Sequence, residues 1–123
     1  MSLEVIYDED SVKARLKLIG KLDTDTAPEL APIIQDIGAA PPAVLVMDLE
    51  DLNYISSAGL RCVFQLKKLL KPHGGQLVIS HPSPQVKKVF DIVKAVPVQS
   101  VFSSTAELDA YLDKMQRSVG QDD

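Results

Sequence analysis

The sequence predicts an α/β fold with a mixed sheet, about five strands and four helices. Two short runs at 3–8 and 13–18 alternate apolar and polar residues around a polar turn, which is typical of an antiparallel hairpin that ends at Gly20. Continuous apolar runs at 43–48 and 76–80 are typical of strands covered on both faces. Because segments with helical spacing separate these runs, the later strands are expected to be mostly parallel.

The first helix is expected soon after the hairpin, with Asp23 and Thr24 as candidate N-terminal caps. Pro32 lies deeper in this segment than proline is usually tolerated, so the helix is expected to start late or to kink. The glycine and prolines of 38–42 end it. Its apolar face has the spacing of one helical side and comprises Ala27, Leu30, Ala31 and Ile34.

The second half of the chain continues the alternation. A loop is expected after the strand at 43–48, and then a helix over 58–71 with Leu60, Val63, Phe64 and Leu70 as its apolar residues. A third helix opens near Pro84, and a short strand is expected at 98–102. The last helix begins with a capping box made of Ser104 and Glu107.

Composition excludes several classes of function. The chain has 123 residues and a formal net charge of −4, so it lacks the basic field that nucleic-acid binding requires. Cys62 is the single cysteine, and His73 and His81 fall in different loops, so no metal site and no cofactor are expected. We expect one domain (1–117), a polar C-terminal tail (118–123), no membrane insertion and a cytoplasmic location.

Catalytic motifs are incomplete, and the chain is not expected to be an enzyme. Gly74 and Gly75 follow a helix instead of opening one, so they cannot direct helix N–H groups at a phosphate. The nucleophile elbow of serine hydrolases needs a glycine where this chain has Ile55. A hydrolase would also require a base beside Ser57, which is the hypothesis that a structure can test.

The segment 48–60 is the candidate functional site, because it leads from a buried strand to the start of a helix. One serine of the pair Ser56 and Ser57 is explained as a helix cap. Small Ala58 and Gly59 would leave the helix end open, and a phosphate there would be favoured by about 0.3–1 kcal/mol. Nearby carboxylates would oppose it; the candidates are Asp23, Asp25, Asp48, Glu50 and Asp51.

The stretch 44–59, read as Val-Leu-Val-Met-Asp-Leu and then Leu-Asn-Tyr-Ile-Ser-Ser-Ala-Gly, resembles STAS domains, and among them the single-domain bacterial anti-anti-sigma factors. The order of elements is also the STAS order, so the resemblance covers 3–115. Two further matches are Gly20-Lys21-Leu22-Asp23 and Gly74-Gly75-Gln76-Leu77.

The resemblance implies partner switching. In this family an unphosphorylated antagonist binds an anti-sigma factor that is also a serine kinase, and the sigma factor is released. Phosphorylation of the antagonist at the start of its second helix dissociates the complex, and a serine phosphatase resets it. This chain would therefore be a ligand and a substrate, not a catalyst.

This sequence departs from the commonest family pattern, Asp-Ser-Ser/Thr-Gly. Alignment on Gly59 places Ser56 at the Asp, Ser57 at the first hydroxyl and Ala58 at the second hydroxyl, which is often the phosphoacceptor. Ser57 is then the first candidate for phosphorylation and Ser56 the second. The alternatives are a copy that binds constitutively, or a non-phosphorylated adaptor subunit of a lipid-transport ABC complex or a sensory assembly.

The resemblance also implies a partner-binding surface around the Asp23 turn, the loop before the second helix and the exposed face of that helix. Its residues are Asp23, Asn53, Tyr54, Ser56, Ser57, Ala58, Gly59, Arg61, Gln65 and Lys68.

Overall fold

The computed structural model describes residues 3–9, 12–95 and 102–119. Within these residues the sheet has the order β1-β2-β3-β5, and β4 pairs with the far end of β2. Among the described strands, β1 and β2 pair antiparallel and the other pairs are parallel. The mixed sheet predicted from the sequence is confirmed. The strands are β1 (Leu3–Asp8), β2 (Lys13–Leu22), β3 (Val44–Asp48), β4 (Leu52–Ile55) and β5 (Gln76–Ser80).

The strand β2 is longer than the hairpin pattern predicts. It continues through Gly20 to Leu22 because β4 supplies a second partner where β3 ends. The register shifts between Gly20 and Lys21, and Gly20 has a φ of 112°, a conformation that side chains with a Cβ rarely adopt. This irregularity turns the end of β2 toward β4.

The expectation of a plain loop before the second helix is wrong. This segment contains β4, in which Leu52 and Ile55 are buried. The spacing of these two residues is neither alternating nor continuous, so the strand gives no periodic signal. The strand expected at 98–102 lies outside the described residues, apart from Phe102, which is not in a strand.

The helices are close to the predicted ranges. The first begins late, as a 3-10 turn η1 (Ala27–Leu30) that leads into α1 (Ala31–Ala39), because each segment places a proline in its first turn. Next come α2 (Ser57–Leu70) and a short 3-10 turn, η2 (Lys71–His73). The chain closes with α3 (Pro84–Ala95) and α5 (Thr105–Ser118), which extends one residue past the predicted domain end.

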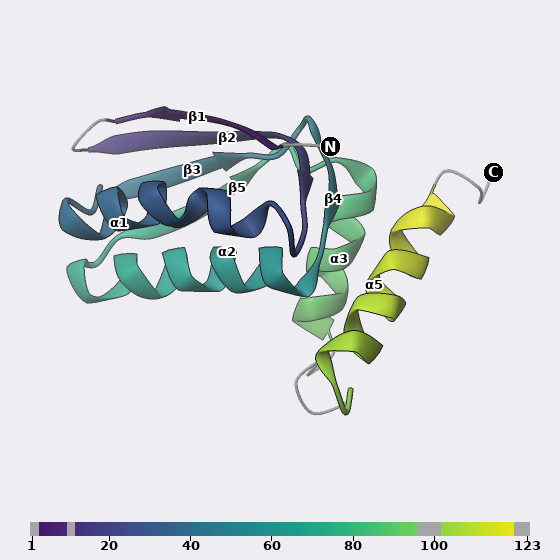
Figure 1. Ribbon diagram of the computed structural model, residues 1–123. Coiled ribbons are helices and arrows are strands. Elements are labelled where there is room, and N and C mark those ends of the chain that lie inside the picture. The colour runs from purple at the N-terminus through teal and green to yellow at the C-terminus, as the bar shows by residue number, and fades with distance from the viewer. Residues whose placement is uncertain (1–2, 10–11, 96–101, 120–123) are drawn as a thin grey trace.

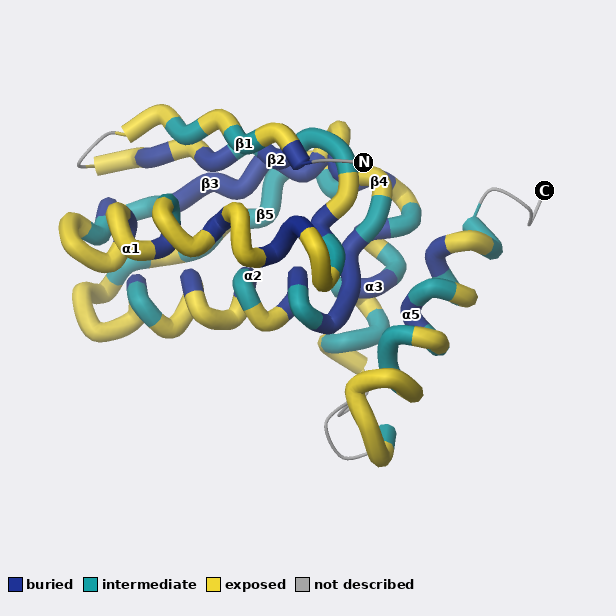
Figure 2. Tube along the Cα trace, in the orientation of Figure 1, coloured by how far each residue is buried: buried dark blue, intermediate teal, exposed yellow. Residues whose placement is uncertain are grey.

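Two layers form the body of the molecule. Figure 1 shows α1 and α2 side by side along one face of the sheet, with α3 and α5 near β4. The core lies between the strands and the inner side of α2, as the buried segments in Figure 2 show. Along α2 the buried stripe includes Leu66, whereas Phe64, one of the apolar residues expected in this helix, is 41% exposed. No helix among the described residues has the length and apolarity that a bilayer crossing demands.

Candidate functional site

The first turn of α2 is capped by the first serine of the pair. Ser56 has an extended backbone, and its hydroxyl oxygen accepts a hydrogen bond from the Gly59 amide at 3.3 Å. Its own amide donates to the Leu22 carbonyl at 2.9 Å, which ties the helix start to the end of β2. Ser56 is 3% exposed. The capping role expected for one serine therefore belongs to Ser56.

The second serine is held by a distant carboxylate. The Ser57 amide donates to Oδ1 of Asp109 at 2.8 Å, and the Ser57 hydroxyl donates to Oδ2 at 3.0 Å. Ser57 is 7% exposed, and Asp109 is half-buried on α5. The positive end of α2, which the sequence left open, thus faces a negative side chain of this chain itself.

Asp109 is the contact of the candidate site that sequence reasoning missed. It lies 52 residues beyond Ser57 and has no motif around it, so only the docking of α5 brings the two together. Two of the carboxylates expected near the serines have other partners. Asp48 accepts from the Glu50 amide at 3.2 Å and lies 3.9 Å from Arg15. Asp51 lies 3.4 Å from Lys17.

Gly59 is buried in the first turn of α2, and its role in partner binding stays a prediction. A Cβ at this position would lie 2.8 Å from the Leu22 carbonyl oxygen and equally close to side-chain atoms of Leu22 and Ile55. Such contacts are far inside van der Waals distance, so Gly59 is what allows α2 to approach the strands.

The Asp23 turn is a closed hydrogen-bonded unit. Oδ1 of Asp23 accepts from the amides of Asp25 and Thr26, each at 3.0 Å. The Thr26 hydroxyl donates to the Lys21 carbonyl at 2.8 Å. The N-cap position of η1 is Thr26, so the helix caps expected at Asp23 and Thr24 are wrong. Asp23 instead caps the turn before η1. It remains half-exposed beside the candidate site.

A polar hollow of about 410 Å³ brings Asp23, Asn53 and Tyr54 together with side chains of α5. Burial raises the pKa of Tyr54 above its usual 10.0, and the carboxylates of Asp113, Asp109 and Asp23 raise it further. Asp113 also accepts a hydrogen bond from the Tyr54 hydroxyl. The three predicted residues on this side are thus near one another, with α5 as one wall of the hollow.

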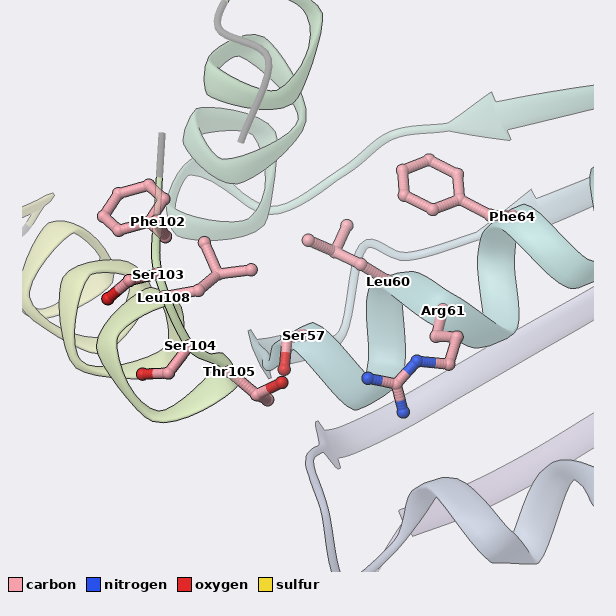
Figure 3. Close-up of a pocket in the computed structure, with 9 residues that line it drawn as sticks. All are labelled: Ser57, Leu60, Arg61, Phe64, Phe102, Ser103, Ser104, Thr105 and Leu108. Atoms are coloured by element: carbon pink, nitrogen blue, oxygen red, sulfur yellow. The ribbon is translucent and has the colours of Figure 1, made fainter. Parts of the chain in front are cut away.

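The outer face of α2 carries the other predicted residues. Arg61, Gln65 and Lys68 are exposed. Arg61 and Ser57 line a hollow of about 330 Å³ between α2 and the start of α5, where Phe64 and Phe102 lie at opposite ends (Figure 3). Arg61 and Gln65, with half-exposed Ala58, line a larger apolar hollow of about 610 Å³ against α1.

A further pair of contacts fixes α5 beside the site. The side chain of Gln116 accepts from the Ile55 amide at 2.9 Å and donates to the Ile55 carbonyl at 2.8 Å. Gln116 is 6% exposed, and its amide also donates to the Leu112 carbonyl within α5. The last residue of β4 is thereby paired on its outer side by a side chain.

Nucleophilic chemistry finds little support around these serines. The Ser57 hydroxyl donates to a carboxylate and not to an imidazole, and the His81 ring pairs with the Ser80 hydroxyl at 2.7 Å. Cys62 is half-buried, and its burial raises the pKa of the thiol, an effect that Arg61 partly offsets. Both observations favour structural roles for these groups.

Two features indicate the class of this protein. They are the mixed sheet and the serine pair at the point where β4 ends and α2 begins. A family model for the STAS domain matches residues 6–108, and the chain belongs to the STAS domain family. The chain is 48% identical over 48 residues to BtrV of Bordetella bronchiseptica, provisionally named an anti-sigma factor antagonist. That match covers 39% of this chain and 41% of BtrV.

A second relative covers more of the chain. The anti-sigma-B factor antagonist of Bacillus subtilis is 27% identical over 92 residues, which are 75% of this chain and 84% of that protein. The fold also resembles solved structures. An anti-sigma factor antagonist from Mycobacterium paratuberculosis has a TM-score of 0.65 at 19% identity, over 96% of this chain and 94% of that one. The unphosphorylated form of SpoIIAA has a TM-score of 0.62 at 17% identity, over 80% and 100%.

Proposed function

We propose that this chain is an anti-sigma factor antagonist, which binds an anti-sigma factor that is a serine kinase in a partner-switching pathway. The names of the two sequence relatives support this role. The observation that carries the proposal is that Ser57 lines the same hollow as Arg61, while Arg61 and Gln65 line the next one. A partner that lies along α2 would touch the switch residue and the binding face together.

The proposed switch is phosphorylation of Ser57, with Ser56 as the second candidate. A P–O bond forms between the γ-phosphorus of ATP and Ser57 Oγ, the bond to the ADP oxygen breaks, and the hydroxyl proton passes to a base of the kinase. The phosphate adds about −1.5 to −2 charge to a surface that bound its partner with a neutral serine. Hydrolysis of the ester by a serine phosphatase restores binding.

The proposed binding surface follows the exposed side of α2 and its neighbouring turns. Arg61, Gln65 and Lys68 present polar side chains to the partner, and Ala58 leaves room for close approach. Asp23, Asn53 and Tyr54 border this surface at the polar hollow. Gly59 contributes indirectly, because it sets how deeply α2 sits against the sheet.

A second candidate function is a STAS adaptor that is never phosphorylated, as in a lipid-transport ABC complex or a sensory assembly. The observation in its favour is that Ser56 and Ser57 are both buried and hydrogen-bonded. Ala58 also has no hydroxyl where the commonest family pattern has one. Such an adaptor would bind its partner without a covalent switch.

Phosphorylation separates the two candidates. The protein is incubated with ATP and an anti-sigma kinase from the same organism, and its intact mass is measured. One added phosphoryl group is expected, and it is lost in Ser57→Ala. The matched control is Thr105→Ala, which removes a hydroxyl from the same helical position of α5 and keeps the phosphate. Phosphate that persists in Ser57→Ala refutes the site, and absence of phosphate on the wild type favours the adaptor.

Affinity tests the switch itself. Ser57→Asp is expected to weaken binding to the kinase at least tenfold, because a buried charge without a partner is costly at an interface. Ser57→Asn has nearly the same shape without the charge and is expected to bind more tightly than Ser57→Asp. Equal affinities of Ser57→Asp and the wild type, measured by calorimetry, would sink the switch.

A further inference from the structure

Helix α5 contacts the candidate site with one of its faces. Asp109, Leu112 and Gln116 recur at the spacing of a single helical side, and Leu112 is fully buried between the two polar residues. This face lies against residues 55–57, which we call the junction, where β4 ends and α2 begins. Figure 1 shows α5 at this end of the molecule, next to α3 and away from α1.

The polar groups of the junction form hydrogen bonds with the two ends of this face of α5. Asp109 takes both the amide and the hydroxyl of Ser57. Gln116 takes both the amide and the carbonyl of Ile55. With α5 in place, Ser57 is 7% exposed and its hydroxyl already donates to a carboxylate of this chain.

This geometry opposes phosphoryl transfer. The γ-phosphate must approach Ser57 Oγ in line with the leaving oxygen, and a base of the kinase must reach the hydroxyl proton. Asp109 lies 3.0 Å from that oxygen and occupies the side from which the base would approach. Its negative charge also repels the phosphates of ATP.

We propose that α5 is a latch over Ser57. The helix must leave the junction before Ser57 is phosphorylated, and it cannot return afterwards. The return is blocked because the phosphate and the Asp109 carboxylate would meet as like charges at hydrogen-bond distance. The position of α5 then reports the phosphorylation state. The gating of phosphorylation rests on the proposed function of Ser57, whereas the docking of α5 does not.

The docking is tested without a kinase, by amide hydrogen exchange followed by NMR. In Asp109→Ala, exchange at Ser57 and along α5 is expected to rise about tenfold, because hydrogen bonds to a charged acceptor are lost. Exchange in the buried strand β3 stays unchanged, which separates undocking from global unfolding. The matched control is Asp91→Asn, which removes a carboxylate of α3 whose partner is Lys87. Unchanged exchange at α5 in Asp109→Ala would overturn the latch.

A charge exchange tests the blocked return. Ser57→Asp places a second carboxylate against Asp109, so α5 amides are expected to exchange faster than in Ser57→Asn. The double variant Ser57→Asp/Asp109→Asn is expected to restore slow exchange, because the new amide donates to the new carboxylate. Equal exchange in Ser57→Asp and in the double variant would contradict a repulsive latch.

The gating is tested with the kinase. Asp109→Ala is expected to accept phosphate several-fold faster than the wild type, and Asp91→Asn at the wild-type rate. A slower rate in Asp109→Ala would mean that Asp109 assists the transfer, and the gating fails. If neither the wild type nor Asp109→Ala accepts phosphate, the proposed function fails together with the gating, while hydrogen exchange still decides whether α5 docks as described.

Discussion

Two helices of this protein begin with nearly the same four residues. The chain enters α2 as Ser-Ser-Ala-Gly and α5 as Ser-Thr-Ala-Glu. In each, the first serine accepts a hydrogen bond from the amide three residues on, at 3.3 Å from Gly59 and 3.1 Å from Glu107. They differ in the source of the carboxylate. Glu107 serves its own helix and accepts from the Ser103 amide at 2.7 Å, whereas α2 receives Asp109 from α5.

The reason for the difference is the space beneath α2. The position that holds Glu107 in α5 holds Gly59 in α2, where any side chain would strike the Leu22 carbonyl. A local carboxylate is excluded there, so the start of α2 depends on a distant residue. Both helices thus have a serine cap. The exposed start of α5 receives its carboxylate from the same helix, whereas the buried start of α2 receives it from α5.

The largest effect is expected from filling the space under α2. Gly59→Ala should lower the free energy of unfolding by about 3 kcal/mol, despite the better helix propensity of alanine, because a backbone carbonyl cannot move aside. Gly38→Ala is the matched control, since its Cβ would lie at an ordinary 3.6 Å from Leu69. That variant should be neutral or slightly stabilising. Urea denaturation measures both, and equal effects would contradict the steric account.

The next effect concerns the remote support itself. Gln116→Ala leaves the buried amide and carbonyl of Ile55 without partners and should cost about 2 kcal/mol. Gln35→Ala, an exposed glutamine on α1, is the control and should change stability little. A loss below that of the control would mean that water replaces Gln116 without penalty. The same denaturation experiment gives the answer.

A smaller difference is expected between the two caps. Ser104→Ala removes an exposed cap and should cost about 0.5–1 kcal/mol, whereas Ser56→Ala should cost about 1–2 kcal/mol because the Gly59 amide is left buried. Thermal unfolding of the two variants side by side measures the difference. A larger loss in Ser104→Ala would reverse the conclusion that α2 has the more demanding helix start.

The smallest expected effect is a change in stability with pH, which depends on the contact between Tyr54 of β4 and the carboxylates of α5. The folded-state pKa of Tyr54 is raised, by burial first and by Asp113, Asp109 and Asp23 next, so the folded protein keeps its phenolic proton longer than the unfolded chain. Stability should therefore fall as the pH rises above about 10. Tyr54→Phe should flatten this loss. Unfolding curves recorded between about pH 9 and pH 11 check the slope, and an unchanged slope would exclude Tyr54 as its source.

Much of the fold follows from local sequence patterns. The hairpin, the buried strands and the capping serines Ser56 and Ser104 each depend on neighbours within a few positions, and the structure has them as expected. The helix cap expected at Asp23 lies at Thr26 instead. Strand β4 is not predicted because its four residues show no alternation of apolar and polar side chains. Its partner is the extension of β2 beyond Gly20. Its existence is a property of the sheet and not of the segment.

The candidate site was predictable only in part. The segment with its serine pair is marked by sequence, but what surrounds the serines is not. Asp109 is one acidic residue among several on a polar helix face, and nothing within its own helix distinguishes it. Phe64 has helical spacing that suits the core, yet Leu66 fills that place. Contacts between elements far apart in sequence decided both.

Gln116 has a consequence for how molecules of this protein meet one another. The side-chain amide of Gln116 presents an oxygen and an N–H to Ile55, as the peptide groups of a neighbouring strand would, and its second N–H donates to the Leu112 carbonyl. Gln116 thus closes the edge of the sheet at Ile55. Uncovered strand edges are templates for pairing with another chain. When α5 moves away, the outer edge of β4 becomes available, and self-association in concentrated solution is the expected cost of any state that keeps this helix detached.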